Sequence, residues 1–109
     1  MKKYSVILCM AMFLVSMPLM AGQYVADADS LYEIGGLESC KKAVSLYEKA
    51  PGSYESDWKC ARACQCAGDA AKDMGSSGWK EETAAYGKKG MEYAAKAIEL
   101  NPNRVEGHY

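Results

Sequence analysis

The sequence has little of what catalytic centres and metal sites are usually built from. It holds a single histidine, His108, close to the end of its 109 residues. It contains no C-x-x-C pair, no P-loop and no nucleophile elbow. Structural zinc prefers four nitrogen or sulfur ligands, usually from paired cysteines together with histidines. We therefore expect a protein with no catalytic residues, no bound metal and no cofactor.

Neither sign of charge is in large excess, and no strand pattern is present. Lysine and arginine number 13 against 14 aspartates and glutamates, which gives a formal net charge of −1. Nucleic acids and anionic lipids attract clustered positive charge, so neither is an expected partner. Outside the first 21 residues no run alternates β-branched with polar residues. The sequence therefore predicts an all-α fold.

The first 21 residues have the composition of a secretory signal peptide. Lys2 and Lys3 precede an apolar run from Val6 to Met20, and the small residue Ala21 follows it. A basic start, a short apolar stretch and a small residue after it make up such a peptide. We predict a signal peptide over residues 1–21 and an exported protein, periplasmic or associated with the cell envelope. The alternative is an uncleaved N-terminal anchor, and either would be the chain's means of contact with a membrane.

Breaker residues divide the following sequence into helical stretches. A short first helix is expected within residues 22–36, from Ala26 to Ile34, before the pair Gly35-Gly36. The next helix is expected from Leu37 to Ala50, where the apolar residues fall at helical spacing. Pro51-Gly52 ends it.

Two longer helices are expected after this break. Ser53 is a suitable N-cap for the first of them, whose side chains are small on nearly all faces, as in a helix packed on both sides. After a turn from Gly75 to Gly78, the second runs from Trp79 to Leu100, either straight or kinked at a glycine. Asn103 to Glu106 has the form of a capping box, which predicts a new helix beginning at residue 104.

Small side chains recur on one stripe of the Trp79–Leu100 helix, at Gly87, Gly90, Ala94 and Ala97. Such a stripe lets a second helix approach closely. Pro102 disfavours helical dihedral angles in the residue before it, so the helix is expected to end there. The residues expected to pack helices together are Ala43, Tyr47, Ala50, Gly90, Ala94, Ala97 and Pro102.

These features resemble the tetratricopeptide repeat. The resemblance rests on the small-aromatic-small spacing of Ala43, Tyr47 and Ala50 and on the string A-I-E-L-N-P-N at residues 97–103. The W-x-x-A-R-A string that starts at Trp58 is similar to the T components of TRAP-type transporter systems, and also to eukaryotic regulators of microtubule dynamics. The resemblance implies a short α-solenoid of stacked antiparallel hairpins over residues 37–109, with a closing turn at 101–103. The helix start signal so close to Tyr109 predicts a truncated chain, and the alternative is a frayed C-terminal cap.

The same resemblance implies a binding function. Stacked helical hairpins of this kind form a groove that holds a protein or peptide partner. The candidate groove-lining residues are the aromatics Trp58, Tyr86 and Tyr93. For the transporter branch, the implied alternative is an accessory subunit of a TRAP-type solute uptake system, with an extracytoplasmic solute-binding protein as partner.

Four cysteines lie beyond the N-terminal stretch: Cys40, Cys60, Cys64 and Cys66. An oxidising compartment permits disulfides, and four cysteines allow three full pairings, so all four are disulfide candidates. Three interpretations remain open. The cysteines serve as small buried apolar residues, Cys40 forms a disulfide with one of the other three, or the cluster of Cys60, Cys64 and Cys66 forms a thiol or metal site.

Overall fold

The computed structural model describes residues 21–75 and 77–104. Most of the predicted signal peptide, the helix expected from residue 104 and His108 lie outside the described residues. The described part is helical and contains no strand, which confirms the all-α prediction. Within it, none of the helices is both long and apolar enough to cross a membrane.

The first helix is longer than the sequence predicts. Residues 21–34 are helical, so the chain is already in a helix five residues before Ala26. An apolar stripe begins before the predicted start: Ala28 is buried in the core, and Val25 and Leu31 are partly buried against it. The helix ends at the predicted pair of glycines, whose φ angles of 76° and 84° suit residues without a Cβ.

The three later helices follow the expected breakers closely. Helix α2 spans Leu37–Glu48, two residues shorter than predicted. Helix α3 spans Tyr54–Met74, and the Ser53 side chain caps it by accepting a hydrogen bond from the Ser56 backbone N–H at 3.1 Å, as predicted. Helix α4 spans Trp79–Leu100 as one continuous helix, without a break at either internal glycine.

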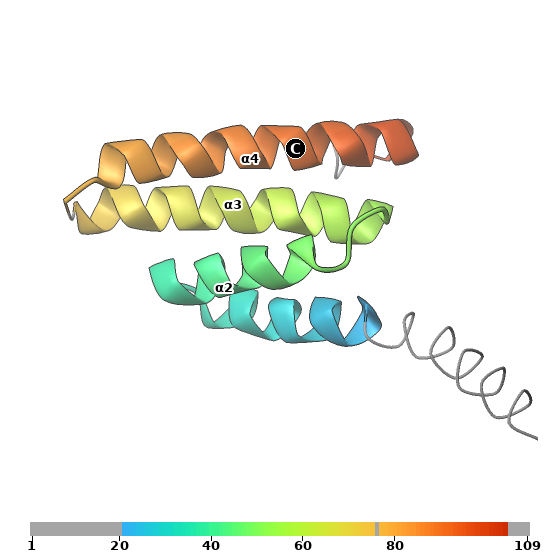
Figure 1. The fold of residues 1–109 in the computed structure, drawn as a ribbon, viewed down its shortest axis with the longest axis horizontal. Helices are drawn as coiled ribbons and strands as arrows, with labels where there is room; N and C mark the ends of the chain where they lie inside the picture. The colour runs from blue at the N-terminus through green and yellow to red at the C-terminus, as the bar shows by residue number, and fades with distance from the viewer. Residues whose placement is uncertain (1–20, 76, 105–109) are drawn as a thin grey trace, which may run out of the picture.

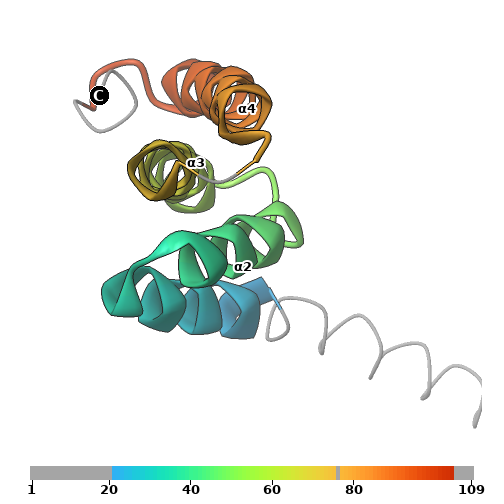
Figure 2. The ribbon, with the colours of Figure 1, turned by 90° about the vertical axis from the view of Figure 1, so that its left-hand side faces the viewer.

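The helices stack in chain order, each antiparallel to the next. Figure 1 shows α3 lying between α2 and α4, and Figure 2 shows the same order from the end of the helices. The helix of residues 21–34 lies on the far side of α2 and α3 from α4. Helix α3 is therefore packed on two sides, as its small side chains predict.

Small side chains make up much of the core. Cys60, Ala63, Cys64 and Ala67 of α3 are fully buried, and Tyr47 of α2 is the largest fully buried side chain. Of the residues expected to pack helices together, those that are buried are Ala43, Tyr47, Ala50 and Ala97. Pro102 is exposed, in the turn that follows α4.

Polar contacts hold the outer helices to the rest of the structure. The Tyr47 hydroxyl donates a hydrogen bond to Asp29 of the first helix, and Lys59 of α3 forms an ion pair with the same carboxylate. Burial, together with the bond to Asp29, raises the pKa of Tyr47 above its usual range. On the other side, α2 is joined to α4 by the ion pair between Glu48 and Lys89, with Oε1 and Nζ 3.0 Å apart.

A buried acid lies in the first turn of α3. Asp57 is 2% exposed, and its Oδ1 has no hydrogen-bond partner among the described residues. Burial raises the pKa of this carboxyl above 3.8, although the nearby Lys96 and the Gly52 backbone act in the opposite direction. The charged form of Asp57 is therefore disfavoured by folding.

We expect Asp57→Asn to stabilise the protein near neutral pH but not in acid. Because the pKa of Asp57 is raised in the folded state, its contribution favours folding below about pH 3.8 and is lost as the pH rises through the folded-state value. Urea denaturation at about pH 3 and about pH 7 measures the difference, with the exposed Glu92→Gln as control. A gain in unfolding free energy that is equal at the two pH values would contradict this assignment.

Candidate functional site: the groove between α3 and α4

The cysteines divide into one disulfide and two free thiols. Cys40 of α2 is bonded to Cys66 of α3, with their Cα atoms 6.1 Å apart, while Cys60 and Cys64 are free and buried. A site built from Cys60, Cys64 and Cys66 as three free thiols is therefore not present. No group of three or more histidines, cysteines or acids in the described ranges is placed to hold a metal ion.

The two free thiols belong to the packing of α3. A hydrogen bond with the Cys64 sulfur, together with burial, raises the pKa of the Cys60 thiol above its usual range. A buried thiol that keeps its proton is a poor nucleophile. Cys60 therefore acts here as a small core side chain. The same hydrogen bond lowers the pKa of the Cys64 thiol, which is also fully buried and lies beneath the closest contact with α4.

Helices α3 and α4 approach closely at two places. A Cβ added at Gly90 would lie 3.2 Å from the Cys64 Cβ and 3.5 Å from the Ala61 carbonyl oxygen. Near the other end of the pair, the Thr83 hydroxyl donates a hydrogen bond of 3.0 Å to the Gly68 carbonyl oxygen. The missing side chain at Gly90 thus permits the close approach that the small-residue stripe predicts.

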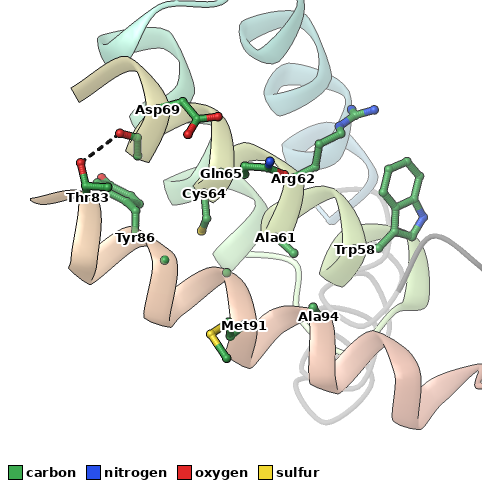
Figure 3. Close-up of a pocket in the computed structure, with 13 residues that line it drawn as sticks. Trp58, Ala61, Arg62, Cys64, Gln65, Asp69, Thr83, Tyr86, Met91 and Ala94 are labelled. Atoms are coloured by element: carbon green, nitrogen blue, oxygen red, sulfur yellow. Dashed lines mark hydrogen bonds between the residues drawn. The ribbon is translucent and has the colours of Figure 1, made fainter. Parts of the chain in front are cut away.

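Beside this line of contact the two helices leave an open groove with a volume of about 510 Å³ (Figure 3). Small residues form much of its lining, and larger side chains stand along it. Figure 3 shows Trp58 and Arg62 toward one end, and Asp69 and Thr83 toward the other. The groove is lined by Trp58, Ala61, Arg62, Cys64, Gln65, Gly68, Asp69, Thr83, Tyr86, Gly87, Gly90, Met91 and Ala94.

The three aromatic candidates fall in different places. Trp58 and Tyr86 line the groove and are half-buried. Tyr93 does not line it, although the sequence suggests that it should, because it is turned into the core, where its hydroxyl donates to Glu48 Oε2 at 3.3 Å. Burial there raises the pKa of Tyr93 to about 12.

The small-residue stripe of α4 is also divided between two roles. Ala97 is buried against the neighbouring helices, whereas Gly87 and Ala94 line the open groove. Gly90 does both, because it contacts α3 and also lines the groove. A Cβ added at Gly87 would meet no other described residue within 4 Å. Ala94, which the sequence assigns to helix packing, therefore has room beside it for another molecule.

Sequence reasoning missed the charged residues of the groove. The Arg62 guanidinium lies 3.9 Å from the centroid of the Tyr32 ring and 5.0 Å from that of Trp58. Its Nε is buried and has no hydrogen bond within the described part of the chain. Stacking on two aromatic rings holds the cation at the groove end. Tyr32 belongs to the first helix, so no local signal around Arg62 indicates this arrangement.

The exposed face of α4 adjoins the groove. A shallow apolar surface on this helix is lined by Ala84, Gly87, Lys88, Met91, Glu92 and Ala95. Gly87 and Met91 belong to both surfaces, and Met91 is 76% exposed. In the described chain only Tyr93 and Ala97 of α4 are buried, and the face that carries this shallow surface is exposed.

Comparisons with protein-family models, with curated proteins and with solved structures found no match. The resemblance to tetratricopeptide repeats and to the transporter components therefore stays a prediction. The function has to be argued from the groove.

Proposed function

We propose that this protein is an exported, non-catalytic adaptor that binds an α-helix of a partner protein in the groove between α3 and α4. The helices are proposed to be hairpins of the tetratricopeptide-like kind. The observation that carries the proposal is the open groove of about 510 Å³, lined by small residues and flanked by Trp58 and Tyr86.

The dimensions of the groove favour a helix as its occupant. The lining residues run from Trp58 to Asp69 on α3 and from Thr83 to Ala94 on α4. At 1.5 Å per residue each stretch is about 16 Å long, or three helical turns. Small residues along both stretches let a third helix approach to about the 8–10 Å typical of packed helices. An elongated apolar groove of this length suits a helix better than a compact small molecule.

Packing of one helix against two others is already present within this protein. Helix α3 packs against both the first helix and α2 through small side chains, among them Cys60 and Ala63. On the following pair, α3 and α4, no helix among the described residues fills the equivalent position. Because a helix already packs in this way on a neighbouring pair, a helix is also the expected occupant of the groove between α3 and α4.

The disulfide supports the exported part of the proposal. Disulfides persist in secreted and periplasmic proteins and are rare in a reducing cytosol. The bond between Cys40 and Cys66 joins α2 to α3, on which the groove is built. An oxidising compartment would thus keep the groove in its folded form.

Selection from a displayed library of helical peptides tests the proposal. We expect the enriched peptides to bind the wild-type protein and to lose at least about tenfold in affinity on Gly87→Leu, whose side chain would fill the groove. The matched control is Ala85→Leu, an exposed position on the same helix that lies outside both the groove and the shallow α4 surface. Enrichment of no helix, or equal loss of affinity on both variants, would contradict the proposal.

A further inference from the structure

Resting on the proposed function, we infer that the groove also accepts α4 of a second copy of this chain, so that two molecules form an antiparallel α4–α4 dimer when no partner helix is bound. Two described features point to this occupant. One is the charge pattern of the groove, and the other is the exposed face of α4.

The groove carries one charge of each sign along α3. Arg62 and Asp69 are the charged members of its described lining, and they are seven residues apart. Seven residues make about two helical turns, so both side chains lie on one face, about 10 Å apart along the axis. A helix seated in the groove pairs with both when it carries an acid and a base at the same spacing.

The directions of the first helix, α2 and α3 indicate how the helix in the groove would run. In Figure 1 the first helix and α3 run in the same direction, whereas α2 between them in the chain runs in the opposite direction. A helix that repeats this arrangement on the α3–α4 pair lies parallel to α3. Its acid must then precede its base in sequence, with the acid meeting Arg62 and the base meeting Asp69.

Helix α4 carries this pattern on an exposed face. Glu81 and Lys88 are exposed and seven residues apart, with the acid first. Between and beyond them lie the small and apolar residues of the shallow α4 surface, including Ala84 and Met91. The pair Glu82 and Lys89 has the same spacing, but both residues already form ion pairs with α2.

The first helix does not offer this pattern. Residues 21–34 contain no lysine or arginine, so this helix has no base to meet Asp69. Its outward positions Gln23, Asp27 and Ser30 are exposed and polar. Head-to-tail stacking through this face is therefore disfavoured, and α4 is the element of a second copy that fits.

The dimer is closed by two-fold symmetry. When α4 of one copy lies parallel to the partner's α3, the two α4 helices are antiparallel, so each supplies Glu81 and Lys88 to the other's groove. The register that pairs these charges brings Ala84 of each copy opposite Gly87 of its partner, which allows the helices to approach closely. Each charge contact occurs twice, so one substitution changes two contacts.

Charge reversal on the full chain tests the dimer. We expect sedimentation equilibrium to show that Asp69→Lys and Lys88→Glu each weaken self-association at least about tenfold, because each places like charges opposite one another twice. The double variant, Asp69→Lys with Lys88→Glu, restores opposite charges and is expected to recover most of the wild-type association. The control is Asp73→Lys, an exposed acid of α3 outside the groove.

The outcomes separate the dimer from the proposed function. A wild-type chain that stays monomeric, or a double variant no stronger than the single ones, overturns the inference. Binding of library-selected helices in the groove would in that case leave the adaptor function standing. A dimer that shows the expected rescue while no selected helix binds or displaces it would support the inference and contradict the adaptor function.

Discussion

Removing the Cys40–Cys66 disulfide is expected to lower the free energy of unfolding by about 3 kcal/mol. The bond closes a loop with a sequence separation of 26 residues, and its loss enlarges the set of conformations open to the unfolded chain. A domain of this size buries only about 60% of its unfolded surface, so a loss of this magnitude is a large part of its total stability.

Urea denaturation of the Cys40→Ala, Cys66→Ala double variant measures this effect. Reductant added to the wild-type protein should lower its stability by a similar amount, whereas the double variant should not respond to reductant. A loss below about 1 kcal/mol in the double variant would show that the bond contributes little to holding α2 on α3.

Two glycines of α4, one helical turn apart, are expected to respond in opposite ways to the same substitution. Gly90→Leu should lower the free energy of unfolding by about 1–3 kcal/mol, because its Cβ alone would lie 3.2 Å from the Cys64 Cβ. Gly87→Leu should raise it by about 0.5–1 kcal/mol, because leucine favours the helix and its Cβ enters open space.

The two leucine variants control for one another, since both replace a glycine in the same helix. Thermal and urea denaturation give the two changes in stability directly. A similar gain in both variants would show that α3 and α4 are not in close contact at Gly90. A similar loss in both would show that the face of α4 at Gly87 is not open, and would also remove the basis for the groove.

Local signals in the sequence account for much of the fold. The glycine pair at 35–36, the Ser53 cap and the turn before Trp79 act on neighbouring residues only, and they place the ends of the helices within a few residues. The early start of the first helix was missed, because Val25 before the predicted start packs against the core, a contact that the local sequence does not show.

The groove was predictable only in part, because its members come from contacts between helices distant in sequence. Trp58 and Tyr86 were expected at a groove from their aromatic character. Tyr93 has the same character, but Glu48 of α2 lies next to it and only the folded chain shows this. The stacking of Arg62 on Tyr32 likewise joins residues thirty positions apart.

The disulfide pairing likewise could not be predicted from the sequence. Helical spacing places Cys60 and Cys64 on one face, and both are buried there as free thiols. The choice of Cys66 as partner of Cys40 depends on how α2 lies against α3, which spacing within one helix does not determine. The structure selects one of the pairings that the sequence leaves open.

Mapping the bound helix on the protein tests the central claim most directly. Amide resonances of the isotopically labelled chain would be followed by NMR during titration with a library-selected helical peptide. The account predicts that the largest shifts fall on the groove stretches of α3, from Trp58 to Asp69, and of α4, from Thr83 to Ala94. Shifts confined to the first helix and α2, or binding unchanged by Gly87→Leu, would contradict it.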